Sequence, residues 1–504
     1  MKAIKYIAIA SLLMLTVNSC TLEREEYSEI YPENFFLTET DLTLAVNALY
    51  YDFSPGLWGA SSVYTADYNG YQTISDLSTD AGWCDWGWES DDLYYQQWTA
   101  TVGLATQFWN CFSHYNYLSK ARNTIRRIEA SSVADNVKSV ALGEAHALRG
   151  WMALYLYDMF GPVPVASDEI LDDPETFVYL PRLTEEEYDE LMETDLRAAI
   201  ELLPEQPSAR GRMSKGAARM ILLKYYMIKG YFDRAETLAR DLYGMEGSVY
   251  TLQPDYNHVF SKAGIGNNEI ILQLPCNVSS TSAVNYVTAE VLPSDYPWGA
   301  EKGTGWGIGY LMPWAFYETY DAADIRRQNI KDSYVNTSGV TVDRSGRLAK
   351  GALPLKYGVD PDMNGGMSYI DLIIYRYSDV LLTLAECIVR NQGSPTVEAI
   401  DLVNRVRTRA GLPGLDATQT GSASAFLDAL LLERGHEFYF EGLRRQDLIR
   451  FGKYVEYANQ RINAANAADA GLGYFTVTDA HNRFPIPQSF IDESKSEIKQ
   501  NPGY

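Results

Sequence analysis

Three tryptophans, Trp83, Trp86 and Trp88, fall within six residues of the stretch GWCDWGWESDD, among acidic residues and glycines. Their spacing is not helical, and burying neighbouring carboxylates such as Asp85 without partners would be costly. Flat aromatic faces beside carboxylates suit a sugar, because its axial C–H groups stack on the rings while its hydroxyls donate to the acids. We therefore expect an exposed or half-exposed glycan platform made of Trp83, Asp85, Trp86 and Trp88.

A second aromatic segment, DYPWGAEKGTGWGIGY, has a similar composition, and its glycines separate Tyr296, Trp298 and Trp306. We expect these three residues to extend the glycan site. Two alternatives remain open for both segments. The rings could form a small hydrophobic core inside an irregular loop, or a surface that binds another protein.

Few residues of the chain suit catalysis. It has five histidines and no HExxH, GxSxG or P-loop motif, so metal-dependent and triad chemistry are unsupported. Glu433 and Glu437 lie one helical turn apart and could in principle form the carboxylate pair of a glycoside hydrolase. The same helical stretch carries four arginines, which favour a structural ion network: Arg434, Arg444, Arg445 and Arg450.

We therefore expect a binding protein that is not an enzyme. The runner-up is a glycoside hydrolase, which would need a carboxylate pair inside the aromatic segments. Four acids are available there: Asp80, Asp85, Glu89 and Asp91.

One further segment, GVDPDMNGGMSYID, follows the spacing of a calcium loop. Its candidate ligands are Asp360, Asp362, Asn364 and Asp371. Pro361 and the terminal aspartate, in place of glutamate, depart from that pattern, so a polar turn is favoured over a calcium site. No other cofactor is expected. Four cysteines show no metal spacing and are expected to be buried thiols, with a Cys84–Cys111 bridge as the alternative: Cys84, Cys111, Cys276 and Cys387.

The charge of the chain limits its partners. The formal net charge is -24, which repels nucleic acid and anionic lipid surfaces. A neutral glycan is therefore favoured over a polyanionic one.

The N-terminus carries a targeting signal. Lys2 and Lys5 precede an apolar run that is too short for a transmembrane helix and ends at Cys20. We interpret residues 1–19 as a lipoprotein signal peptide and Cys20 as the acylated residue. Residues 20–37 then form a lipid-anchored acidic segment at the membrane.

The rest of the chain, residues 38–504, is predicted to be one mainly α domain. Apolar residues recur at helical spacing, and two segments read as tetratricopeptide-like helical pairs, at 214–243 and 377–410. These pairs would form a curved scaffold. Two long irregular regions, at about 56–98 and 250–366, contain the aromatic segments and a few short strands, and would carry the ligand site.

Several motifs together resemble the SusD/RagB family of surface glycan-binding lipoproteins of Bacteroidetes. They are the Cys20 box followed by acidic residues, DLSTDAGW, ALRGWMALYLYDMFGPVPV, RYSDVLLTLAECIVR, ERGHEFYFEGLRRQDLIRFGKY, FPIPQSF and the terminal QNPGY. The resemblance implies a lipid-anchored protein on the outer-membrane surface that packs against a SusC-like TonB-dependent transporter and delivers oligosaccharide to it without catalysis. A helical repeat scaffold whose loops bind only protein is the remaining alternative.

Overall fold

The computed structural model describes residues 35–56, 62–64, 70–84, 88–101, 104–173, 175, 177–277, 279, 283–297, 305, 307 and 309–504, with the backbone alone for 88–90 and 105–107. The predicted signal peptide and Cys20 lie outside these residues. None of the helices in this part of the chain is both long and apolar enough to cross a membrane.

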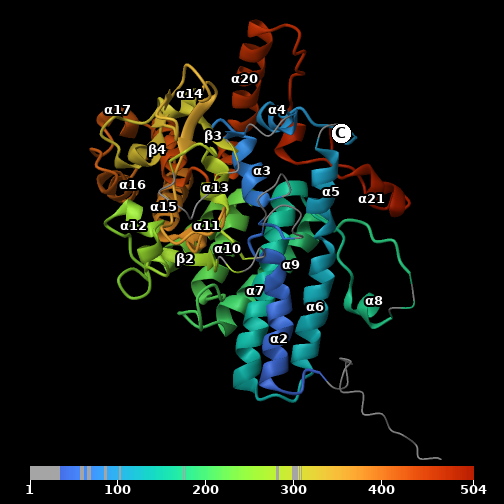
Figure 1. The fold of residues 1–504 in the computed structure, drawn as a ribbon. Helices are drawn as coiled ribbons and strands as arrows, with labels where there is room; N and C mark the ends of the chain where they lie inside the picture. The colour runs from blue at the N-terminus through green and yellow to red at the C-terminus, as the bar shows by residue number, and fades with distance from the viewer. Residues whose placement is uncertain are drawn as a thin grey trace, which may run out of the picture.

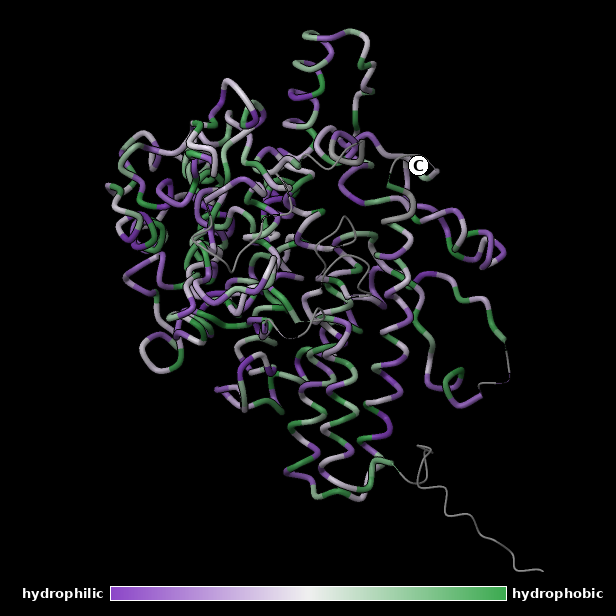
Figure 2. The backbone as a smooth tube through the Cα atoms, viewed as in Figure 1, coloured by the Kyte–Doolittle hydropathy of each residue, from purple (hydrophilic) through white to green (hydrophobic). Residues whose placement is uncertain are grey.

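Four helices lie side by side at one end of the molecule: α2 (Glu39–Tyr50), α6 (Asn116–Glu129), α7 (Asp135–Phe160) and α9 (Glu185–Leu202) (Figure 1). The Thr38 side chain and Asp41 cap α2 reciprocally, and Thr184 and Glu187 do the same for α9. Polar and apolar residues alternate along α2 and α6 (Figure 2), because one face of each helix packs inward. In α7, by contrast, every residue from Gly143 to Phe160 is buried.

Both predicted tetratricopeptide-like pairs are confirmed. They are α10 (Lys215–Lys229) with α11 (Phe232–Tyr243), and α15 (Tyr377–Gln392) with α16 (Val397–Arg409). Gly230 and Gly393 end the first helix of each pair in the left-handed conformation. Because α9 packs on α10 and α11 packs on α15, the pairs continue the layer that begins with α7.

Two helical stretches of the chain are each divided into two helices. One consists of α5 (Ala105–Ser113) and α6, and the other of α18 (Ala423–Phe438) and α19 (Arg444–Arg450). Between α18 and α19, Phe440 and Gly442 have positive φ angles of 55° and 75°. This turn directs Glu441 into the interior, where it pairs with buried cations.

The strands in the described residues are few and short, as predicted, and they pair in antiparallel fashion. One sheet has the order β1 (Trp83–Cys84), β3 (Tyr310–Pro313), β7 (Gly351–Pro354) and β4 (Ile330–Lys331). Two further pairs are β2 (Ile270–Leu274) with β8 (Leu372–Arg376), and β5 (Tyr334–Val335) with β6 (Thr341–Val342).

The other described elements are mostly one or two turns long. They are η1 (Tyr51–Phe53), α3 (Tyr71–Leu77), α4 (Trp88–Tyr94), α8 (Asp168–Asp172), α12 (Tyr256–Val259), η2 (Lys262–Gly264), α13 (Val287–Val291), α14 (Trp314–Tyr317), η3 (Ile325–Asn329), α17 (Ala417–Thr420), α20 (Tyr454–Ala468), η4 (Asp479–Asn482) and α21 (Gln488–Glu493).

Candidate functional site

The pairing of β1 with β3 brings the two aromatic segments together. Trp83 lies opposite Leu311, and Cys84 lies opposite Tyr310. Because the strands are antiparallel, the chain that leaves β1 after Cys84 and the chain that enters β3 before Tyr310 are at the same end of the sheet. The first chain continues with Asp85, and the second is the end of the segment that contains Trp306.

Trp83 differs from its prediction. Its side chain is only 8% exposed, and the Lys350 ammonium lies 5.6 Å from the centre of its ring. The carboxylates that suggested exposure follow the strand in sequence and are not part of it, whereas Trp83 itself pairs with Leu311 of β3. Trp83 is therefore a core residue, and our expectation of an exposed ring is wrong for it.

Most of the other predicted site residues lie outside the residues that the structure describes. Asp85, Trp86, Trp298 and Trp306 are among the residues that the structure leaves undescribed, and Trp88 begins α4 with its backbone alone. Their role in ligand binding stays a prediction.

Tyr296 is described and half-buried. Its ring lies 5.5 Å from the ring of Tyr334 at an interplanar angle of 45°, and burial raises the pKa of Tyr296. The Tyr334 hydroxyl donates to Asp295 at 2.9 Å, and Arg347 pairs with the same carboxylate at 3.2 Å. Tyr296, near the start of the second aromatic segment, thus packs against Tyr334 of β5.

The end of that segment is also held in place. Gly305 lies so close to α13 that a Cβ atom there would be 1.9 Å from the carbonyl oxygen of Leu292. The Gly309 N–H donates to the carbonyl of Glu290 at 2.6 Å, and the hydroxyls of Tyr310 and Thr73 share a hydrogen bond of 2.8 Å. The second aromatic segment is therefore anchored on both sides of its central residues.

Of the four carboxylates considered for hydrolysis, the two that the structure describes are each bound by another residue of the protein. Asp80 binds Arg444 through both oxygens at 2.9 and 2.8 Å, and Asp91 accepts from the Tyr474 hydroxyl at 3.1 Å. Asp85 and the side chain of Glu89 lie outside the description.

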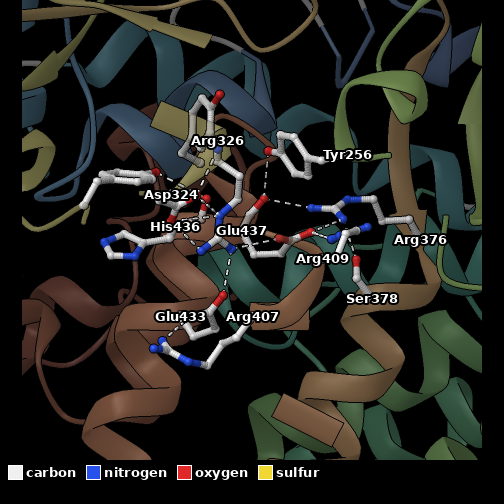
Figure 3. A network of polar contacts seen from close by, with 12 residues as sticks. Tyr256, Asp324, Arg326, Arg376, Ser378, Arg407, Arg409, Glu433, His436 and Glu437 are labelled. Carbon is white, nitrogen blue, oxygen red and sulfur yellow. Dashed lines mark hydrogen bonds and ion pairs between the residues drawn. The ribbon is translucent and has the colours of Figure 1, made fainter. Parts of the chain in front are cut away.

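Glu433 and Glu437, the other acid pair, lie inside a buried ion network (Figure 3). Arg326 donates to Glu433 at 2.7 Å and to Glu437 at 3.0 Å, while Arg376 and Arg409 also bind Glu437. Burial alone would raise the pKa of Glu437, but Arg409, Arg376 and Arg326 outweigh it and hold that pKa well below its ordinary value. A carboxylate that stays ionised in this way cannot supply a proton near neutral pH, so the structural interpretation of the pair is confirmed.

The partners in this network differ from those predicted. They come from η3, β8 and α16, because the turn at Phe440 and Gly442 directs the arginines of α19 toward other acids. The four arginines expected to pair with the two glutamates bind as follows: Arg434 with Asp379 and Asp447, Arg444 with Asp80, Arg445 with Asp158, and Arg450 with Glu386 and Asp447.

The network continues to Glu441, which the sequence did not single out. Arg376 donates to Glu441 at 2.7 and 2.8 Å and to Glu269 at 2.9 Å. Lys356 donates to Glu441 at 2.5 Å, and burial lowers the pKa of Lys356 to about 8 in spite of this acid. Residues far apart in the sequence are thus joined by paired buried charges, and periodicity within one helix could not reveal this.

The acids of the calcium-like segment take other partners. Asp360 accepts from the backbone N–H groups of Asp362 and Tyr369 at 2.9 and 2.7 Å, and Asp362 pairs with Lys262. Asp371 accepts from the N–H of Cys276 at 3.0 Å and pairs with Arg210 at 3.3 Å. Asn364 exchanges backbone hydrogen bonds with Met367 in a tight turn. Within the described residues, no group of three or more His, Cys, Asp or Glu side chains is arranged to hold a metal ion.

The four cysteines of the domain are buried thiols, as expected. Cys84 and Cys111 do not form a disulfide with each other, and neither do Cys276 and Cys387. Burial raises the pKa of the Cys276 and Cys387 thiols, so both stay protonated and unreactive near neutral pH.

Two family models match the chain. The model described as the SusD family matches residues 312–504, and the one described as "Starch-binding associating with outer membrane" matches residues 22–227. Among similar proteins, SusD-like protein P2 of Formosa agariphila is 25% identical over 99% of this chain and 100% of its own. The starch-binding protein SusD of Bacteroides thetaiotaomicron is 28% identical over 33% of this chain and 26% of its own.

Solved structures share the fold. A SusD superfamily protein of Bacteroides vulgatus is 22% identical with a TM-score of 0.74, covering 93% of this chain and 100% of its own. Surface glycan-binding protein A of Bacteroides thetaiotaomicron, in complex with laminarihexaose, is 23% identical with a TM-score of 0.71, covering 91% of this chain and 98% of its own. The mainly helical fold with tetratricopeptide-like pairs is therefore that of the SusD superfamily.

Proposed function

Because the chain belongs to the SusD family, we propose that it binds a neutral oligosaccharide or polysaccharide at the outer-membrane surface and delivers it to a partner TonB-dependent transporter. Proteins of this family bind glycans without catalysing a reaction, and this chain is a binding protein and not an enzyme. The description of one matching family model names starch binding and the outer membrane, which supports both the ligand class and the location.

The observation that carries the proposal is the pairing of β1 with β3. Trp86 and Trp88 follow one strand of the pair, and Trp298 and Trp306 precede the other. Segments that leave one end of a sheet can form a continuous surface, and the buried Trp83 gives that end a rigid base. We propose a glycan site made of Asp85, Trp86, Trp88, Tyr296, Trp298 and Trp306, with Trp83 as its support.

The membrane anchor and the transporter are further parts of the proposal. The Cys20 box behind an apolar run supports acylation at the outer membrane. The continuous helical layer from α7 to α16 supports a protein partner, because stacked helical pairs offer an extended surface for docking.

The proposal is tested by affinity electrophoresis of the protein lacking residues 1–20 in gels that contain a panel of neutral and acidic polysaccharides. A Trp86→Ala, Trp298→Ala double variant should lose retention on the polysaccharide that slows the wild type, and it should keep the wild-type circular dichroism spectrum. Trp109→Ala is the matched control, because Trp109 is 43% exposed on α5, outside both aromatic segments. Equal retention of the double variant and the control would overturn the site.

The same gels separate the alternatives. A ladder of shortened products after incubation with polysaccharide would identify a hydrolase and overturn the binding-only assignment. A protein-binding scaffold would show no retention on any polysaccharide.

A further inference from the structure

The chain between α7 and α9 forms an arm, which comprises the described residues 165–173, 175 and 177–183 and includes α8. Figure 1 shows this arm at the side of the helical layer, and hydrogen bonds join α8 to α6. Phe177 is 78% exposed and the neighbouring Val178 is 44% exposed, although both side chains are apolar. Adjacent uncovered apolar side chains on a projecting segment are typical of a binding surface.

Both sides of the arm are fixed to the body of the protein. Arg122 of α6 donates to the two oxygens of Asp168 at 2.8 and 2.6 Å, and Arg126 of the same helix pairs with Asp172. On the returning side, Arg182 donates to two backbone carbonyls at 2.6 and 2.7 Å. Since the arm is already held in place, a partner that covers Phe177 need not first order it, which lowers the cost of binding.

The arm lies near the end of the bundle where the described chain begins. Arg126, which holds α8, is in the last turn of α6, and Ser131 just after that helix donates to the carbonyl of Phe36 at 2.5 Å. Under the proposed acylation of Cys20, residues 21–34 join the lipid to this end and can span at most about 50 Å. The end of the molecule that carries the arm is therefore the one tethered to the membrane.

The charge of the arm favours one kind of surface at the membrane. Its described residues hold five acids and no cation before Arg182: Asp168, Glu169, Asp172, Asp173 and Glu175. Anionic lipid headgroups repel these acids, and so does a second copy of a chain whose net charge is -24. Glu169, Asp173 and Glu175 are exposed, so a protein surface that surrounds an apolar pocket with lysines or arginines fits both the acids and Phe177.

We propose that the arm docks on the partner TonB-dependent transporter, with Phe177 in an apolar pocket that lysine and arginine side chains surround. The inference rests on the proposed function, because it assigns a docking element for the transporter that this function requires. An aromatic ring that leaves water only in the complex is the kind of anchor that carries a large share of binding energy.

The test replaces Phe177 with the photoreactive residue p-benzoylphenylalanine in the full-length, affinity-tagged lipoprotein, inside the cells that produce it. After irradiation, mass spectrometry of the purified adduct identifies the attached partner. We expect a lysine- or arginine-containing extracellular peptide of a TonB-dependent transporter. The matched control places the same photoreactive residue at Val340, which is 57% exposed between β5 and β6, and it should give no such adduct.

Phe177→Asp supplies a second measurement, the amount of transporter recovered with the affinity-purified lipoprotein from detergent-solubilised membranes. We expect at least about tenfold less transporter than with the wild type, and no change with Val340→Asp. Glu169→Lys, Glu175→Lys keeps Phe177 and should also lower the recovery, because it reverses two charges that face the basic rim. Since Phe177 is exposed, Phe177→Asp should keep the wild-type thermal unfolding midpoint and polysaccharide retention.

Four results would overturn the arm as the docking element: no adduct at position 177, an adduct with lipid, an adduct between two copies, or equal recovery of transporter with Phe177→Asp and Val340→Asp. If that recovery is equal to the wild type while Trp86→Ala, Trp298→Ala still loses glycan retention, the arm is wrong and the proposed function stands. If the wild type recovers no transporter, both the arm and delivery to a transporter are wrong.

Discussion

At the scale of single residues, Glu437 is a buried carboxylate that three arginines bind. It is fully buried and is bound by Arg326, Arg376 and Arg409, of which Arg376 and Arg409 also bind Glu269. Pairing makes burial of these charges tolerable, so removing one partner leaves the others uncompensated.

Glu437→Gln should lower the free energy of unfolding by about 3–5 kcal/mol, because it removes one charge of a buried network and leaves the others. Urea unfolding followed by tryptophan fluorescence measures the loss. Glu398→Gln is the control, because Glu398 pairs with Arg240 on the surface and its loss should cost less than about 1 kcal/mol. Equal stabilities of the two variants would show that the network contributes no more than a surface pair.

The lowered pKa of Glu437 also predicts how the free energy of unfolding changes as the pH falls. The pKa of Glu437 is lowered in the folded state, so its contribution is fully present above the unfolded pKa, which is about 4.3, and is lost as pH falls through the folded pKa. Between pH values of about 5 and 3, the wild type should therefore lose more stability than Glu437→Gln. The urea-unfolding midpoints of the wild type and of Glu437→Gln across this pH range measure the difference. If the two midpoints change with pH in parallel, the lowered pKa of Glu437 is wrong.

At the scale of elements, two glycines are required by geometry, for different reasons. Gly393 ends α15 with a φ of 70° and open space around it, so only backbone strain opposes a side chain. Gly305 is limited by the carbonyl of Leu292, which a Cβ atom would clash with.

Gly393→Ala should destabilise the protein by about 1 kcal/mol, and Gly393→Asn by less, because asparagine tolerates the left-handed conformation better. The midpoint of thermal unfolding measures the change. Gly346→Ala is the control, because Gly346 lacks a positive φ and its nearest contact would be at 3.9 Å. A neutral Gly393→Ala would mean that the helix end adjusts freely.

Gly305→Ala should act on binding more than on stability. The added Cβ would displace the chain between α13 and β3, in which Trp306 is the next residue of the proposed site. We expect retention on the bound polysaccharide to fall about tenfold, a cost of about 1.4 kcal/mol, with little change in thermal unfolding. Unchanged retention would argue against a site at this end of the sheet.

Helix periodicity and cap residues predicted the elements well, and long-range pairing explains the failures. The pair formed by α10 and α11 matches the predicted range 214–243 because Gly230 and the apolar spacing that follows are local signals. The pairing of β1 with β3 joins residues more than two hundred positions apart, and no local signal in two-residue strands reveals it. For the same reason Trp83 was expected at the surface, and Arg326 and Arg376 were not recognised as partners of Glu437.

At the scale of the whole molecule, the buried ion networks shape the surface. Arg326, Arg376, Arg409, Arg434 and Arg445 are buried against acids, so these cations offer no charge to a ligand. The net charge of -24 is thus carried by a surface with fewer accessible cations than the composition suggests. A ligand of many negative charges meets repulsion over most of this surface.

This charge distribution predicts how salt affects binding. Retention on a neutral polysaccharide should stay nearly constant between about 50 and 500 mM NaCl, because stacking and hydrogen bonds between neutral groups are little screened. Affinity electrophoresis at the two salt concentrations measures the retention. A neutral polysaccharide whose retention falls steeply with salt would place charge pairing, and not the aromatic rings, at the centre of recognition.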